Sequence, residues 1–193
     1  MKVIIVEGTD NTGKDTIINR LRSLCNRTLI IHCNKPKMTR PEAQAFEQNA
    51  LFKKYVDNIV DETYDDDICD MLIFNRAWYG EYVYGTMYRE RDKRDVMSMI
   101  HALEKRLNEF DDTHSIEIYY VQVVCDSVAL LKKNDDGLSI SHDAENFIHE
   151  NELFKEIFDA STLKNKKLIH VNDGDEFRDR DAIFNEVYEF IGK

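Results

Sequence analysis

The 193-residue sequence predicts an α/β fold, a five-stranded parallel sheet with helices on both faces. Three observations support this fold class. Short apolar segments rich in β-branched residues alternate with longer segments whose apolar residues recur at helical spacing. A glycine-rich loop directly follows the first apolar segment. The length suits one domain, and no repeat, linker or low-complexity tract divides it. We therefore expect a single domain over residues 1–193.

Five segments are expected to form the strands. The first, 3–6, is a run of four β-branched residues, as in a strand covered on both faces. The longest is apolar at nearly every position, which again indicates burial on both faces. The five expected strands are 3–6, 28–33, 71–74, 116–125 and 167–171.

The segments between these strands keep helical spacing. In the first helix, Ile17, Ile18, Leu21 and Leu24 fall on one side. In the second, Pro41 suits the first turn, and the apolar positions that follow are Ala43, Phe46, Ala50, Phe52, Val56, Ile59 and Val60. The expected helices are 15–26, 41–62, 96–110, 145–160 and 182–191, with a short one starting near Asp126.

Composition narrows the class of protein. Apolar residues make up 42% and charged residues 33%, which suits a globular chain rather than a disordered one. No apolar run approaches the roughly 20 residues of a membrane span, and the start of the chain does not resemble a signal peptide. The four cysteines lack CxxC spacing, so we expect free thiols. Together, these observations lead us to expect a cytoplasmic protein with no membrane partner.

The formal net charge of −11 argues against a nucleic acid as partner, because phosphate neutralisation by basic groups supplies much of such affinity. A local basic groove is still compatible with that charge. The sequence leaves the assembly open between a monomer and a homodimer.

The fold class predicts where the chemistry lies. In open parallel sheets, ligands bind beyond the carboxyl ends of the strands. That rule brings 7–16, 32–37, 75–79 and the residues from 126 onward to one rim of the sheet.

The loop after the first strand has the spacing G-x-x-x-x-G-K, and it opens a helix. Glycines let backbone N–H groups turn toward phosphate oxygens, and the helix N-terminus adds partial positive charge. A lysine at this place can reach the β- and γ-phosphates. We therefore expect ATP as co-substrate, with its phosphates bound by Gly8, Asn11, Thr12, Gly13, Lys14, Asp15 and Thr16.

The residue after Lys14 departs from the common motif. A Ser or Thr usually stands there and ligates Mg²⁺, whereas this chain has Asp15 followed by Thr16. Either Asp15 ligates Mg²⁺ directly, or Asp15 turns outward and Thr16 or water-bridged carboxylates hold the metal. Mg²⁺ is expected as the cofactor in both cases, with Asp15 and Thr16 as the candidate ligands.

Cations follow the second and third strands. Lys35 and Arg40 suit an acceptor phosphate, although solvated surface charge explains them equally well. Arg76, at the end of the third strand, can stabilise charge on a transferring phosphoryl group. The aromatic run that follows either packs a helix or forms a wall against a base and sugar, with Tyr79 and Tyr84 as its acceptor-binding members: Trp78, Tyr79, Tyr82, Tyr84 and Tyr88.

Over about the first 90 residues, these motifs resemble the thymidylate kinase family, including its phage-encoded members. The opening Glu7-Gly8-x-Asp10-x-x-Gly13-Lys14-x-Thr16 is similar to that of the family, and Asn75-Arg76 stands where the family has Asp-Arg. Tyr84 falls at the spacing of a tyrosine close to the substrate sugar. The resemblance implies catalytic roles for Asp10, Lys14 and Arg76 and an acceptor-phosphate contact for Lys35. Three departures are Asn75 for an acid, Asp15 for Ser and Gly85 for Gln.

Related kinases close a lid over the transferred phosphate. The candidate lid here is about 132–145, with Lys132 and Lys133 in place of the family's arginines. A solvated loop is the alternative.

The expected function is ATP-dependent phosphoryl transfer to a deoxynucleoside monophosphate, with a dTMP-like pyrimidine favoured. One alternative is a kinase for a hydroxyl of a nucleoside or of a modified base in DNA, in which Asp10 or Glu81 acts as base. Another is a non-catalytic NTP-binding module, which the departures at Asp15 and Asn75 would suit.

Overall fold

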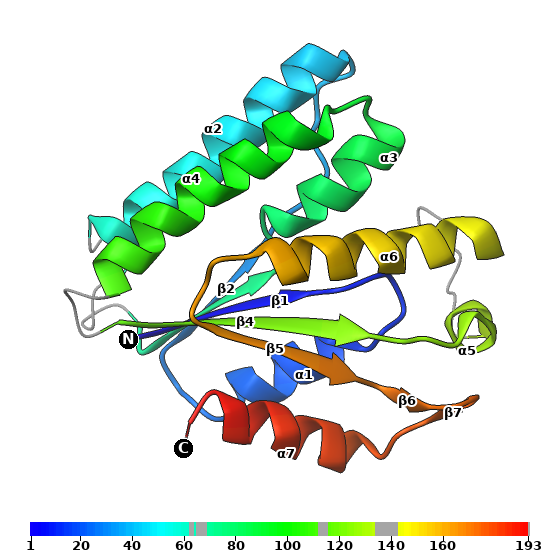
Figure 1. The fold of residues 1–193 in the computed structure, drawn as a ribbon. Helices are drawn as coiled ribbons and strands as arrows, with labels where there is room; N and C mark the ends of the chain where they lie inside the picture. Colours follow the sequence, from blue (N-terminus) through cyan, green and yellow to red (C-terminus); the bar gives the residue numbers. More distant parts are fainter. Residues whose placement is uncertain (62–63, 65–68, 112–115, 134–142, 193) are drawn as a thin grey trace.

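The computed structural model describes residues 1–61, 64, 69–111, 116–133 and 143–192, and in them the expected parallel sheet is confirmed. Its strands lie in the order β2-β3-β1-β4-β5, so that β1 is central (Figure 1). The strand bounds are β1 (Lys2–Glu7), β2 (Thr28–His32), β3 (Met71–Asn75), β4 (Glu117–Val124) and β5 (Asn165–His170).

The central strand shows why its sequence is apolar throughout. Val3 and Ile5 point into one hydrophobic core and Ile4 and Val6 into the other, and all four are fully buried. A strand between two helical layers has no face left for polar residues. Lys2 stands level with Met71 of β3 and with Glu117 of β4, which brings the carboxyl ends of the three strands to one rim.

Helices cover both faces of the sheet. Figure 1 shows α2, α4 and α6 on one side and α1 and α7 on the other. Within the described residues, no helix is long and apolar enough to cross a membrane, and all four cysteines are free thiols. The helices are α1 (Lys14–Arg22), α2 (Pro41–Val60), the π-helical turn η1 (Glu81–Gly85), α3 (Thr86–Tyr88), α4 (Lys93–Asp111), α5 (Val128–Lys133), α6 (Ala144–Ala160) and α7 (Arg180–Phe190).

Three details differ from the sequence prediction. Helix α1 ends at Arg22 with Ser23 as its C-cap, and Leu24, expected on the buried side, is 45% exposed beyond that end. Phe46, expected among the apolar positions of the second helix, is 77% exposed on α2. The sequence analysis also missed a two-stranded hairpin, β6 (Asn172–Asp173) and β7 (Glu176–Phe177), whose two-residue strands are too short to show alternation.

Candidate active site

The loop between β1 and α1 requires both of its glycines. Gly8 has φ 145°, and a Cβ atom there would lie 2.2 Å from the carbonyl oxygen of Val123 on β4. Gly13 has φ 82°, in the left-handed region, where it caps the start of α1. The backbone therefore turns tightly into the helix, as a phosphate-binding loop must.

Lys14 folds back across this loop. Its ammonium donates to the carbonyl oxygen of Thr9, and the hydroxyl of Thr12 donates to the same oxygen over 2.9 Å. Burial lowers the pKa of Lys14 to about 7, with the nearby Arg76 acting in the same direction. A phosphate anion bound in the loop would favour the charged ammonium, so ligand binding and protonation of Lys14 are coupled.

Arg76 leaves the end of β3 in a conformation that is uncommon outside glycine. Its φ is 65°, and its backbone N–H donates to Val6 O over 3.0 Å. Its guanidinium pairs with Asp10 and lies 4.8 Å from the centre of the Tyr84 ring. The structure thus brings together Asp10 and Arg76, two of the three predicted catalytic residues, and both act electrostatically on Lys14.

Glu7 lies beneath this group, at the end of β1, and is fully buried. Its Oε1 accepts hydrogen bonds from Ala77 N at 2.6 Å and Gly80 N at 3.2 Å, which fixes the loop that follows Arg76. Burial raises the pKa of Glu7 to about 7, although Arg76 opposes that change. Sequence reasoning gave Glu7 no role of its own. The signal was an acid at the end of an otherwise apolar buried strand.

Asp15 and Asn75, the two departures from the common motif, are in contact. Asn75 Nδ2 donates to Asp15 Oδ1 over 2.7 Å, and His32 Nδ1 lies 3.2 Å from the same nitrogen. Asp15 and Thr16 are both exposed at the rim. Within the described residues, no three His, Cys, Asp or Glu side chains cluster as a metal site, so a magnesium ion would take most ligands from phosphate and water. The exposed oxygens of Asp15 and Thr16 fit such an ion.

A cleft of about 770 Å³ opens beside Arg76, on the side of β2, α2 and η1. Four cationic and two acidic side chains line it, which makes it locally basic in a chain of net charge −11. Among the predicted acceptor-binding residues, Lys35 and Tyr84 line it. The lining residues are Asp10, Cys33, Asn34, Lys35, Pro36, Lys37, Gln48, Phe52, Arg76, Ala77, Gly80, Glu81, Tyr84 and Arg89.

Tyr79 and Arg40, also predicted for acceptor binding, do not line this cleft. Tyr79 is fully buried in the core, where its ring stacks on Tyr120 at 4.1 Å and its hydroxyl donates to Glu104. The helical phase turns Tyr79 toward α4 and turns Tyr84 toward the cleft. Arg40 is exposed at the N-cap of α2.

The wall of the cleft contains a buried ion-pair cluster. Glu81 on η1 is 3% exposed, and its carboxylate pairs with Arg89 and with Arg91, the latter over 2.9 Å. A Cβ atom on Gly85 would lie 2.8 Å from Glu81 Oε1, so a glycine at this position leaves room for the cluster. Because both carboxylate oxygens are engaged, Glu81 is a poor candidate for a general base.

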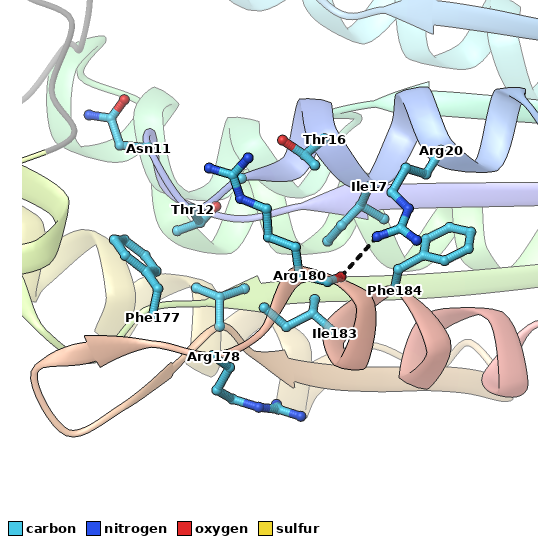
Figure 2. Close-up of a pocket in the computed structure, with 12 residues that line it drawn as sticks. Asn11, Thr12, Thr16, Ile17, Arg20, Phe177, Arg178, Arg180, Ile183 and Phe184 are labelled. Atoms are coloured by element: carbon cyan, nitrogen blue, oxygen red, sulfur yellow. Dashed lines mark hydrogen bonds between the residues drawn. The ribbon is translucent and has the colours of Figure 1, made fainter.

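A second pocket, of about 190 Å³, lies on the other side of the phosphate loop (Figure 2). It is bounded by residues 11–13, by α1, by the β6–β7 hairpin and by the start of α7. Figure 2 shows the Arg180 side chain reaching toward Thr12 and Thr16, while Arg178 points away and pairs with Glu186. Within the described residues the Arg180 guanidinium has no hydrogen-bond or ion-pair partner. Sequence reasoning missed this pocket.

The lid prediction falls mostly on 134–142, outside the described residues. Lys132 and Lys133 are described, and both are exposed in the last turn of α5.

Comparison with solved structures shows a shared fold. A thymidylate kinase from Candida albicans is 15% identical, with a TM-score of 0.66 over 98% of this chain and 90% of that one. The YorR protein of Bacillus subtilis, solved with phosphorylated GDP, is 18% identical, with a TM-score of 0.63 over 96% and 92%. Polyphosphate kinase 2 from Arthrobacter aurescens TC1 is 13% identical, with a TM-score of 0.66 over 99% and 68%.

The sequence itself identifies the family. No curated protein matches the chain. A family model for polyphosphate kinase 2 (PPK2) matches residues 1–128, which include the phosphate loop, Asn75-Arg76 and the cleft. The resemblance to thymidylate kinases is therefore supported at the level of the P-loop kinase fold, and membership of that particular family is not shown. The chain is a phosphotransferase that belongs to the polyphosphate kinase 2 (PPK2) family.

Proposed function

We propose that this protein transfers the γ-phosphoryl group of ATP to a deoxynucleoside monophosphate, with a dTMP-like pyrimidine favoured as acceptor. The observation that carries the proposal is the pair of cavities on opposite sides of the phosphate loop. One contains Asp10 and Arg76, and the other is formed by residues 11–13 with an apolar wall. A donor with a base and an acceptor nucleotide need two such cavities that meet at the transferred phosphate.

The residues at the meeting point supply positioning and charge neutralisation, which phosphoryl transfer mainly requires. Lys14 and the backbone N–H groups of residues 8–16 would hold the donor phosphates. Arg76, oriented by Asp10, would face the phosphoryl group during its transfer and stabilise its charge. A phosphate acceptor is already ionised at neutral pH, so no general base is needed. A magnesium ion, when bound beside Asp15 and Thr16, would add neutralising charge to the phosphates.

The acceptor cleft supports a nucleotide of this kind. Lys35 and Arg76 line it at the ends of neighbouring strands, where they can share one phosphate. Tyr84 is 4% exposed, and the part of its ring that remains accessible lines this cleft, where we propose that it packs against the sugar. A ring against C2′ would disfavour a ribose by about 1–3 kcal/mol, or ten- to two-hundred-fold in kcat/KM.

A second candidate is phosphoryl exchange with inorganic polyphosphate, which the family match favours directly. The basic lining of the cleft, with Lys35 and Lys37 outside any ion pair in the described residues, is compatible with such a polyanion. The two candidates differ in the donor, because a polyphosphate chain has no base for the pocket of Figure 2.

One experiment tests both candidates. Product formation is measured for each pairing of ATP or polyphosphate with dTMP, its ribonucleotide counterpart, thymidine or duplex DNA. We expect the highest kcat/KM for ATP with dTMP, and no turnover in Lys14→Ala. Activity only with polyphosphate would establish the second candidate. Activity only with thymidine or DNA would show a hydroxyl acceptor, and full activity in Lys14→Ala would exclude the proposed site.

The same assay addresses the sugar. In Tyr84→Ala we expect the preference for dTMP over its ribonucleotide to fall by about tenfold or more. Unchanged preference together with a loss of stability, as expected for a core ring, would assign Tyr84 to packing alone.

A further inference from the structure

The contact between Asp15 and Asn75 joins two positions that P-loop enzymes use for the metal. Asp15 is in the first turn of α1, directly after Lys14, and Asn75 is the last residue of β3, directly before Arg76. Commonly the helix position is Ser or Thr and an acid on a nearby strand completes the magnesium site. Here the acid is on the helix and the neutral polar residue is on the strand.

The geometry shows that the two positions are close enough to exchange their side chains. Asn75 Nδ2 and Asp15 Oδ1 are 2.7 Å apart, so a carboxylate on either residue occupies nearly the same part of the rim. The rim therefore retains one carboxylate and one neutral polar group. Compared with the common arrangement, the carboxylate lies on the helix instead of the strand, and the neutral group lies on the strand instead of the helix. Two carboxylates at this separation would repel each other strongly without a cation between them.

Asn75 is itself held in place. Its backbone carbonyl accepts from Cys33 N over 3.2 Å, in the parallel pairing of β2 with β3. Its side-chain nitrogen lies between Asp15 Oδ1 and His32 Nδ1, so both hydrogens find an acceptor when the imidazole carries its proton on Nε2. Asp15 therefore accepts its hydrogen bond through Oδ1. Its Oδ2 has no hydrogen-bond partner among the described residues.

We propose that Asp15 supplies from helix α1 the carboxylate oxygen for a phosphate-bound divalent cation, and that Asn75 is the positioning residue that orients it. The inference rests on the proposed function only in requiring a metal–nucleotide complex at the phosphate loop. The ligand class is a hard divalent cation such as Mg²⁺ or Mn²⁺, bound together with nucleotide phosphates. Asn75 makes no contact with the cation in this arrangement and acts through Asp15.

The test restores the common order of residues. Mn²⁺ binding in the presence of ADP is measured by electron paramagnetic resonance for wild type, Asp15→Ser, Asn75→Asp and the double variant. We expect Asp15→Ser to weaken Mn²⁺ binding about ten- to hundred-fold, because the serine hydroxyl can ligate the cation but neither rim position then carries a carboxylate. The double variant should regain wild-type affinity within about threefold, because the carboxylate then returns from β3. Asp159→Ser, an exposed acid near the end of α6, serves as matched control and should change nothing.

Asn75→Asp alone gives a second readout that does not depend on catalysis. With two carboxylates in contact, its melting temperature should fall in EDTA, and Mg²⁺ should restore it more than it does in wild type. The proposal would be overturned if Asp15→Ser bound Mn²⁺ as tightly as wild type does. It would also be overturned if the double variant bound Mn²⁺ no more tightly than Asp15→Ser. ADP affinity in EDTA separates these outcomes from a failed phosphate loop. Since no acceptor is present, the result is independent of which nucleotide is phosphorylated.

Discussion

Glu7 shows how one buried acid both shapes the site and alters its pH response. Its carboxylate fixes the loop after Arg76 through two backbone N–H groups, and no solvent reaches it. The unfolded chain would release this proton near pH 4.5, whereas burial raises the pKa of the folded carboxyl to about 7. Between these values the folded protein therefore binds a proton that the unfolded protein has lost.

The sign of the effect follows from this linkage. The contribution of Glu7 to stability is fully present below about pH 4.5 and is lost as the pH rises to 7, by at most about 3 kcal/mol. Glu7→Gln retains an oxygen for Ala77 N and Gly80 N but cannot ionise. We expect the difference in free energy of unfolding between wild type and Glu7→Gln to shift toward the variant from pH 5 to pH 7.5.

Urea denaturation at several pH values measures this difference directly. Lys14, whose pKa burial lowers to about 7, makes the folded protein gain stability as the pH rises above 7. Because the Glu7 carboxylate raises the pKa of Lys14, Glu7→Gln should begin this gain at a lower pH, so the contribution of Glu7 is read from the data between pH 5 and pH 7. Measurements above pH 5 also avoid the titration of acids such as Asp57 and Glu156. Hydrogen-bonded partners lower the pKa values of these two carboxyls, so both stay ionised in this range. A pH-independent difference would show that Glu7 is ionised in the folded protein across the range.

At the scale of elements, the β6–β7 hairpin and the start of α7 bound the pocket that we propose for the donor. The hairpin turns through Gly174, with φ 58°, and carries Phe177, 39% exposed, to the pocket beside the phosphate loop (Figure 2). Across the same pocket, Arg180 extends toward the loop. An aromatic ring and a guanidinium that has no partner among the described residues suit a planar base, because both stack on π-faces.

Phe177→Ala tests the role of this hairpin. Loss of one aromatic stack costs about 1–3 kcal/mol, so we expect the KM for ATP to rise about five- to 150-fold while kcat changes little. Use of polyphosphate as donor, if any, should be unaffected. Phe46→Ala removes a ring that is also exposed but lies on α2, and it should leave both constants unchanged. Equal effects of the two substitutions would rule out a base-stacking role for Phe177.

The elements also show how far the sequence could predict the site. The phosphate loop was predictable because its glycines and lysine lie within nine residues and act locally. The contact of Asp15 with Asn75 spans 60 residues, so only the tertiary fold reveals it. Tyr84 lines the cleft and Tyr79 does not, although both are buried, because helical phase turns their rings in different directions and neither sequence neighbourhood marks that direction.

On the scale of the whole molecule, Glu104 connects three distant segments. It is fully buried on α4, and its two carboxyl oxygens accept four hydrogen bonds. Tyr79 Oη donates over 2.7 Å, Ser161 Oγ over 2.5 Å, and the N–H and hydroxyl of Thr162 each over 2.8 Å. These donors come from the segment after β3 and from the connection between α6 and β5. The network therefore joins α4 to both of these segments.

Glu104→Gln should destabilise this assembly without changing its shape greatly. An amide has one acceptor oxygen, so its NH₂ group would face the donors from Thr162 or from Tyr79 and leave them unsatisfied in the core. We expect a loss of about 2–4 kcal/mol in the free energy of unfolding, and a fall in melting temperature of about 4–16 °C for a domain of this size.

Glu109→Gln, at an exposed position on the same helix, is the matched control and should change stability by less than about 0.5 kcal/mol. At a temperature where both variants are folded, kcat/KM should remain near the wild-type value, because Glu104 lies behind Tyr79 and does not line the acceptor cleft. If Glu104→Gln instead retained full stability while acceptor KM rose, the carboxylate would act on substrate binding rather than on the cohesion of the fold. Tyr79 would then have to be reconsidered as a member of the acceptor site, since its hydroxyl is the group that joins Glu104 to the aromatic segment.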